Sequence, residues 1–280
     1  MVYISFQTEK EAKTMMKYIS AHPMSAELQI YLSYDGKQRI LLKIEADVFQ
    51  KIIELLSDTF QVYIKEEWML YVIEQIIREK FLFKEREEID QILDIASSIM
   101  EGERFSKTVF WEEAIVSIKE GLQSIAENQL SFSFESFVKF RLRKLNEMLI
   151  QYVEHAIDEY KLEQDYQSFI YLLRNFMINQ TPKMNILHIL HRETFEFYNE
   201  AFEKMGKQEL IRLIDRKLLA ENPLYIDSNV IAPLISIAPN ELLIYTESAE
   251  NGIIQTIQRI FEERSKILSL DQFYSSCMCK

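Results

Sequence analysis

The chain has 280 residues, and its 32 lysines and arginines against 44 aspartates and glutamates give it a formal net charge of −12. Hydrophobic residues make up 48% and charged residues 27%, which excludes a disordered chain and predicts a packed core along most of its length. The low counts of five glycines and five prolines disfavour a loop-rich, all-β protein. The acidic balance disfavours nonspecific adhesion to DNA or to anionic membranes, but it leaves a local basic patch open.

Residues 1–65 have the pattern of an α+β unit in the order β-α-β-β-α. Thr8 and Glu11 have the spacing of a capping box at the start of a helix. Asp35-Gly36 is the strongest hairpin signal in the chain, because both turn positions favour a positive φ. The predicted elements are a strand at 2–6, a helix from Thr8 to about residue 22, strands at 27–34 and 39–45, and a helix from Asp47 to about residue 64.

Residues 66–180 are predicted to be a long helical region. Apolar residues recur at helical spacing, and the predicted helices cover 66–83, 89–102, about 106–128 and 134–178. Within the last of these, apolar residues recur at alternating steps of four and three. These residues are Val138, Leu142, Leu145, Leu149, Tyr152 and Ala156. Such a heptad seam predicts packing along another helix.

Residues 181–280 are predicted to form a small α/β unit that ends in β-α-β order. The predicted strands are 186–191, 241–246 and 267–270, and the predicted helices are 207–219, a segment at 230–235 capped by Asp227 and shortened by Pro233, and 253–261. The sequence therefore predicts an α+β protein with three regions: an N-terminal β-α-β-β-α unit (1–65), a helical middle (66–180) and a C-terminal α/β unit (181–280).

The cellular compartment is predicted from two kinds of segment, a signal peptide and a membrane span. The N-terminus has no basic region followed by an apolar core, so we expect no signal peptide. The longest stretch without a charged residue, Ser228 to Asn240, has 13 residues and two prolines, whereas a membrane span needs about 18 apolar residues. We therefore expect a cytoplasmic protein with no membrane span.

Glycine usage bears on catalysis. The glycines stand at 36, 102, 121, 206 and 252, so neither phosphate-binding glycine motif nor the elbow of serine hydrolases can be written anywhere in the chain. The abundant carboxylates form charge runs typical of solvated helix faces, and no catalytic residue can be selected from them. The sequence favours a protein that is not an enzyme and predicts no cofactor, while it leaves catalysis open.

Two pairs of residues could ligate a metal. His188 and His191 lie in a predicted strand, where positions three apart point to opposite faces, so we interpret them as structural. Cys277 and Cys279 supply two soft ligands, half of a tetrahedral zinc site, which a dimer would have to complete. The favoured interpretation is a solvated C-terminal tail with no metal.

A basic cluster is the candidate binding site. Lys139, Arg141, Arg143 and Lys144 place four cations within six residues of an acidic chain. Such a cluster is typical of a contact for phosphate, nucleic acid or an acidic protein. The simpler interpretation is that the cations pair with Glu135 and Glu147 at i+4 spacing and keep the helix soluble.

Aromatic residues precede and interrupt this cluster. Phe132, Phe134, Phe137 and Phe140 could form a surface on which bases stack, but aromatic residues at a helix junction are more often buried in the core. We therefore expect these four residues to be core residues.

The segment 131–152, SFSFESFVKFRLRKLNEMLIQY, resembles the central part of the YtxC family. Further likenesses are Ile237-Ala238-Pro239 before a strand, the run Ile260 to Arg264, and a tail that carries cysteines. The likeness extends over the whole chain. It implies a soluble protein of endospore-forming bacteria that is linked to sporulation, and it supplies no catalytic residue because the family has no assigned activity.

These observations lead to two main functional hypotheses, and an enzyme with dispersed carboxylates in a concave pocket is a third. The first is a cytoplasmic, sporulation-associated protein that acts through contacts with an unidentified protein partner rather than through catalysis. The alternative is a module that binds nucleic acid or phosphate through the basic cluster at 139–144.

Overall fold

A computed structural model describes residues 2–102, 109–215 and 229–278, and it divides the chain into two compact units, Met1–Leu162 (unit 1) and Glu163–Lys280 (unit 2). The predicted α+β class is confirmed, because a mixed sheet with helices stands at each end of the chain and a long helical region lies between them. The predicted boundaries near residues 65 and 180 stay predictions.

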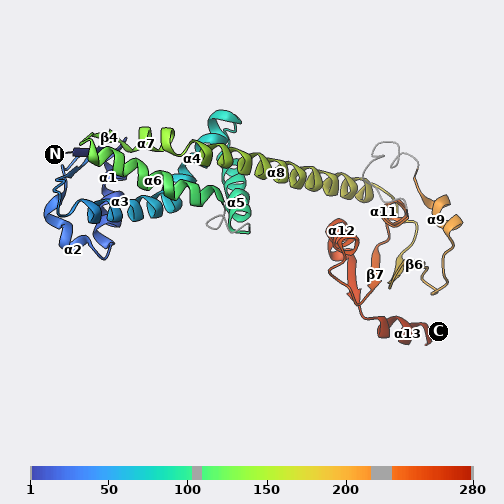
Figure 1. Cartoon of the computed structure of the whole chain (residues 1–280). Helices are drawn as coiled ribbons and strands as arrows, with labels where there is room; N and C mark the ends of the chain where they lie inside the picture. Colours follow the sequence, from blue (N-terminus) through green and yellow to red (C-terminus); the bar gives the residue numbers. More distant parts are fainter. Residues whose placement is uncertain (1, 103–108, 216–228, 279–280) are drawn as a thin grey trace. The chain divides into compact units, whose positions relative to one another are not determined.

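Unit 1 begins with a mixed sheet and continues with helices (Figure 1). Its elements are β1 (Val2–Ser5), α1 (Glu9–Ala21), α2 (Ser25–Leu28), η1 (Gln29–Tyr31), β2 (Leu32–Tyr34), β3 (Arg39–Leu42), α3 (Phe49–Tyr63), the π-helical turn η2 (Ile64–Trp68), α4 (Met69–Gln75), the π-helical turn η3 (Ile76–Lys80), α5 (Arg86–Gly102), α6 (Val109–Glu127), β4 (Phe132–Ser133), α7 (Phe134–Arg141) and α8 (Arg143–Ile178). Helix α8 begins in unit 1 and ends in unit 2.

The sheet of unit 1 has the order β2-β3-β1-β4. Strand β3 pairs antiparallel with both β2 and β1, whereas β4 pairs parallel to β1. The predicted hairpin is confirmed: Gly36 has a φ of 80°, and the Asp35 N–H donates to the Arg39 carbonyl at 3.1 Å. The predicted helix cap is confirmed as well, since the Glu11 N–H donates to Thr8 Oγ1 at 3.2 Å.

The predicted strand over 27–34 is wrong in its first half. Residues 25–31 form α2 and η1, and only Leu32–Tyr34 are extended. Leu28 and Leu32, four residues apart, are buried, while Ile30 between them is 79% exposed. A spacing of four residues fits one face of a strand as well as one face of a helix, so the pattern of apolar residues did not decide between the two.

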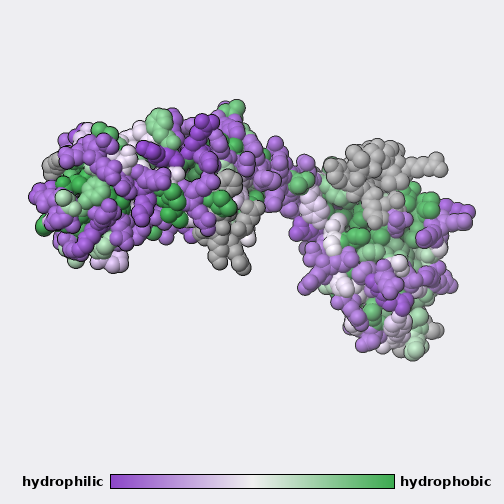
Figure 2. Space-filling model, viewed as in Figure 1, coloured by the Kyte–Doolittle hydropathy of each residue, from purple (hydrophilic) through white to green (hydrophobic). Residues whose placement is uncertain are grey.

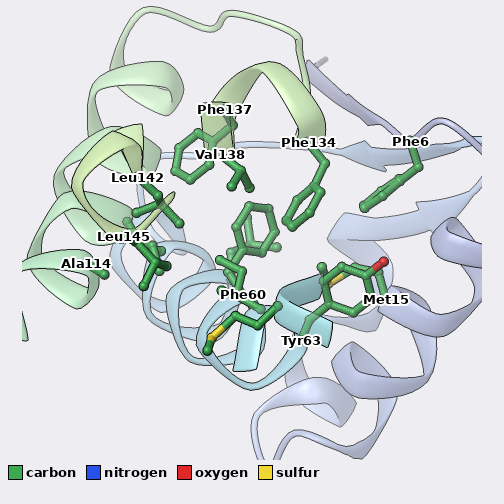
Figure 3. Packing of buried hydrophobic residues seen from close by; sticks show 14 of the residues in the cluster. Phe6, Met15, Phe60, Tyr63, Ala114, Phe134, Phe137, Val138, Leu142 and Leu145 are labelled. Atoms are coloured by element: carbon green, nitrogen blue, oxygen red, sulfur yellow. The ribbon is translucent and has the colours of Figure 1, made fainter. Parts of the chain in front are cut away.

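An aromatic cluster fills the core of unit 1 where α7 meets the sheet and α3 (Figure 3). The Phe134 ring stacks on Phe6 at 5.5 Å between centroids and meets Phe60 and Tyr63 edge-on at 5.3 and 5.2 Å. Phe137 meets Phe60 edge-on at 5.6 Å. The first turns of α7 are thus fixed by aromatic contacts to elements from the start of the chain.

Unit 2 is built around a second mixed sheet with the order β6-β5-β7-β8. Strands β5, β7 and β8 run parallel, and β6 pairs antiparallel with β5. Besides the end of α8, its elements are β5 (Ile186–His191), β6 (Phe195–Tyr198), α9 (Lys207–Leu213), α11 (Ile231–Ile237), β7 (Glu241–Tyr245), α12 (Gly252–Phe261), η5 (Glu262–Arg264), β8 (Ser265–Leu268) and α13 (Leu270–Met278).

The predicted strands 186–191 and 241–246 are confirmed, and so is the β-α-β order of β7, α12 and β8. Pro233 lies in the first turn of α11, where the missing N–H has no partner within the helix, so a short helix forms around it. The predicted cap Asp227 and the end of the predicted helix 207–219 lie outside the described residues.

Hydrophilic residues cover most of the visible face of unit 1, and hydrophobic residues form separate patches on it (Figure 2). Across the described parts of the chain, no helix combines the length and the apolar character that a membrane crossing requires.

Candidate functional site

The helix that carries the basic cluster is broken within the cluster. Helix α7 ends at Arg141 and α8 begins at Arg143, with Leu142 between them at φ −111° and ψ 33°. The hydrogen bonds on both sides persist, since Leu142 N–H donates to the Val138 carbonyl and Asn146 N–H donates to the Leu142 carbonyl.

The predicted heptad seam is buried despite this break. All six of its residues, Val138, Leu142, Leu145, Leu149, Tyr152 and Ala156, belong to the core of unit 1. The sequence therefore predicted the burial of the seam but not the interruption of the helix at Leu142.

Three of the four predicted cations line one groove. This cavity of about 500 Å³, here called the α6 groove, lies between α6 and the junction of α7 and α8. Its lining residues are Val109, Glu112, Glu113, Ala114, Val116, Ser117, Arg141, Leu142, Arg143, Lys144 and Leu145. Five of these residues are apolar, and two of the five are well exposed, Val109 at 66% and Val116 at 54%.

The cations of the α6 groove differ in their partners. Arg143 Nε donates to Glu147 Oε1 at 2.9 Å, which is the i+4 pair expected from the sequence. Lys144 instead reaches Glu113 on α6, with 2.8 Å between Nζ and Oε2. The hydrogen bond to Glu113 raises the pKa of Lys144. Arg141 makes no ion pair with any described residue.

Lys139 lies in a different groove. A second cavity of about 570 Å³, here called the α4 groove, is bounded by α1, the helix from α3 to η3, α7 and Asn146 of α8. Its lining residues are Gln7, Thr8, Lys10, Glu11, Thr14, Tyr63, Glu67, Trp68, Tyr71, Val72, Gln75, Glu79, Phe134, Glu135, Lys139 and Asn146. The expected pair between Lys139 and Glu135 does not form, and neither residue pairs with another described residue.

The aromatic residues around the cluster separate into core and surface. Phe134 and Phe137 are buried at 4% exposure and Phe132 is half-buried, as the sequence predicts. Phe140 is 77% exposed, so the prediction of burial is wrong for this residue. It stands between Lys139 and Arg141 in the chain, and therefore between two residues that line different grooves.

Three of the four residues considered as metal ligands, His188, His191 and Cys277, belong to the part of the chain that the structure describes. His188 Nδ1 lies 3.1 Å from the Tyr245 hydroxyl and His191 Nδ1 lies 2.9 Å from Thr246 Oγ1; both histidines are buried, and burial lowers the pKa of His191. Cys277 is exposed, and Cys279 lies outside the described residues. Over residues 2–102, 109–215 and 229–278, no group of three or more metal-ligating side chains is found.

The sequence did not predict the α6 residues that line the α6 groove or the aromatic wall of the α4 groove. Val109, Val116, Glu112 and Glu113 of α6 were assigned to a helix, but no signal linked them to the cations more than twenty residues later. The aromatic wall of the α4 groove, Trp68 and Tyr71, was likewise unrecognised, since helical spacing alone does not separate core residues from groove residues.

The geometry defines an α+β protein with two surface grooves on the helices of unit 1. The model of the YtxC-like family matches residues 50–266, and the chain therefore belongs to this family. It is 37% identical over 229 residues, 80% of this chain and 79% of the other, to "Uncharacterized protein YtxC" of Bacillus subtilis (strain 168). No solved structure matches the chain.

Proposed function

We propose that the protein is a cytoplasmic, sporulation-associated factor that acts through protein contacts rather than catalysis. Its contact surface is the α6 groove together with Phe140. The partner it fits is a protein segment that carries both apolar and acidic side chains. The exposed apolar side chains beside the cations are the observation that carries this proposal.

Those apolar side chains favour a protein over a nucleic acid. Phe140, Val109 and Val116 are 77%, 66% and 54% exposed. Val109 and Val116 line the α6 groove, and Phe140 directly precedes its lining residue Arg141 in the chain. Exposed apolar side chains mark interaction surfaces, and aromatic residues with arginine are enriched at the centres of protein interfaces. An aliphatic segment of a partner would cover these groups, whereas a phosphate backbone would leave them in water.

The state of the cations also disfavours nucleic acid. Arg143 and Lys144 are already paired with Glu147 and Glu113, and the chain carries a net charge of −12. Each pair lowers the positive potential that a phosphate would meet, so affinity through counterion release would be small. Arg141, which has no carboxylate partner among the described residues, is the cation that a partner's carboxylate would engage.

The link to sporulation rests on family membership. The matched relative comes from Bacillus subtilis (strain 168), and the resemblance to the YtxC family implies a protein of endospore-forming bacteria. Deletion of the gene is expected to reduce the yield of heat-resistant spores. A deletion strain that sporulates normally under every condition tested would count against this part of the proposal.

Affinity capture from sporulating cells tests the contact surface. The full-length protein, the double variant Val116→Ser with Phe140→Ser, and a control variant are compared, each with and without nuclease. The control is Val62→Ser with Tyr171→Ser, which changes an exposed valine and an exposed aromatic residue outside both grooves.

The proposal predicts that a protein is retained after nuclease treatment, that the groove variant loses it, and that the control variant keeps it. Capture that nuclease abolishes would favour the nucleic-acid hypothesis. Equal capture by all three proteins would exclude the α6 groove as the contact surface.

A further inference from the structure

The α4 groove has an apolar wall lined by carboxylates that form no ion pair with a described residue, whereas Glu113 of the α6 groove is paired with Lys144. Its apolar wall consists of Tyr63, Trp68, Tyr71, Val72 and Phe134. Phe134 and Tyr63 are fixed in the aromatic core, while Trp68 is half-buried and Tyr71 is 49% exposed. The groove therefore has a rigid apolar floor and two aromatic side chains that a ligand can reach. Its volume of about 570 Å³ lies within the range of ligand sites.

The charged groups around this wall are predominantly acidic. Four carboxylates and two ammonium groups line the groove, a formal balance of −2. These residues are Glu11, Glu67, Glu79, Glu135, Lys10 and Lys139. None of the six forms an ion pair with a described residue. By contrast, Glu74 of α4, which does not line the groove, forms ion pairs with both Arg78 and Arg86. Their negative field is felt within the groove: burial raises the pKa of the Tyr63 hydroxyl, and the charges of Glu11 and Glu67 raise it further.

Two π-helical turns place the acidic and aromatic side chains along the groove. The Met69 N–H donates to the Ile64 carbonyl, and the Phe81 N–H donates to the Ile76 carbonyl, both five residues back. The first turn contains Glu67 and Trp68, and the second contains Glu79. Such turns insert an extra residue into a helix and are frequent at functional sites, because they redirect side chains without ending the helix.

We propose that the α4 groove binds a basic segment of a partner protein, in which lysine or arginine side chains flank an apolar side chain. Carboxylates form charge-assisted hydrogen bonds with ammonium and guanidinium groups, and the faces of Trp68 and Tyr71 attract the same cations. The apolar wall between the carboxylates accommodates the apolar side chain. This site and its partner are separate from the α6 groove, so the two proposals stand independently.

The distance between Glu67 and Glu79 favours a peptide segment as the ligand over a single basic side chain, which could not reach both carboxylates. Glu67 and Glu79 are 12 residues apart on one helical stretch. At 1.5 Å per residue this places them roughly 18 Å apart along the helix axis. An extended peptide covers that distance with about five residues. Two basic side chains separated by a short segment can therefore reach both carboxylates.

Fluorescence anisotropy with a labelled peptide of alternating lysine and leucine tests the proposal on the full chain. A matched peptide with glutamate in place of lysine is the ligand control. The groove variant is Glu67→Gln with Glu79→Gln, and the control variant is Glu54→Gln with Glu120→Gln. The control removes the same charge from exposed helix positions outside both grooves. A second comparison replaces Tyr71 in the groove and the exposed Tyr171 of α8, each by serine.

The groove variant is expected to bind the lysine peptide about fivefold more weakly or worse, since two exposed ion pairs are lost, while the control variant binds as the native chain does. Tyr71→Ser is expected to weaken binding and Tyr171→Ser to leave it unchanged. Equal weakening in both glutamine variants would show attraction by net charge alone and would overturn the proposal. Two other results would overturn it: equal binding of the glutamate peptide, or binding of spermidine, but not of the peptide, that depends on Glu67 and Glu79.

Discussion

The charged side chains on the two sides of α7 differ in whether they form ion pairs. On the α6 side, Arg143 and Lys144 are paired with Glu147 and Glu113, and the apolar side chains of Val109 and Val116 are exposed beside these pairs. On the α4 side, the carboxylates and Lys139 have no ion-pair partner among the described residues. The linear cluster at 139–144 thus belongs to two surfaces with different chemistry. The density of charge in a sequence does not tell which charges are compensated in the fold.

The largest expected effect is on the floor of the α4 groove. Phe134→Ala removes a ring that packs on Phe6, Phe60 and Tyr63, and it should lower the free energy of unfolding by about 3 to 5 kcal/mol. Denaturant unfolding followed by circular dichroism measures this loss. A loss below about 1 kcal/mol would mean that α7 is not anchored by this cluster.

The close approach of α6 and α7 gives the next effect. A Cβ added at Gly121 would lie 2.8 Å from Phe137 Cε2, so the buried Phe137 ring or the α6 backbone would have to shift. Gly121→Leu should therefore destabilise the protein by about 1 to 3 kcal/mol and disturb the α6 groove. Gly102→Ala is the control, because nothing lies within 4 Å of a Cβ there. If both variants unfolded at the same denaturant concentration as the native chain, the packing of α6 on α7 would be contradicted.

The hydrogen bond between Tyr18 of α1 and Glu66 of η2 should make the stability of the protein depend on pH. The Tyr18 hydroxyl donates to Glu66 Oε2 at 2.8 Å, and this bond raises the pKa of Tyr18 to about 12. The unfolded chain loses the tyrosine proton near pH 10, while the folded chain keeps it, so stability should fall as the pH rises from about 10 toward 12. Thermal unfolding of Tyr18→Phe should show a smaller fall than that of the native chain. Tyr171→Phe serves as the control, and an equal fall in all three proteins would exclude this role of Tyr18.

The smallest effect is expected at the exposed ring of α7. Phe140→Ala should change the free energy of unfolding by no more than about 0.5 kcal/mol, because the side chain is 77% exposed. A small loss for Phe140→Ala and a large loss for Phe134→Ala would show that α7 has one exposed and one buried phenylalanine at these positions. A loss comparable to that of Phe134→Ala would place Phe140 in a packed environment.

The sequence predicted the class of the fold because its signals are local. The capping box at Thr8, the turn at Gly36 and the buried strand β5 each depend on neighbouring residues. The failure at residues 27–31 has a local cause too, since Leu28 and Leu32 fit both a strand and a helix, and only tertiary packing decides between them.

The candidate site was predicted in part. Four cations were identified, and one of the two expected ion pairs, Arg143 with Glu147, forms. The break at Leu142 has no signal in the sequence, because Leu142 continues the heptad spacing and is buried as expected. The partner of Lys144 is Glu113, 31 residues earlier, and such a pair depends on how α6 packs. Local patterns therefore identify the charges, and tertiary packing determines their partners.

Photocrosslinking in sporulating cells tests most directly whether the protein acts through the α6 groove. A photoreactive amino acid replaces Val116, which is 54% exposed in the groove, or Val62, which is 41% exposed on α3 and outside it. Contact of a partner protein with the α6 groove predicts a discrete protein adduct, resistant to nuclease, from position 116 and none from position 62. An adduct that nuclease removes, or the same adducts from both positions, would contradict it.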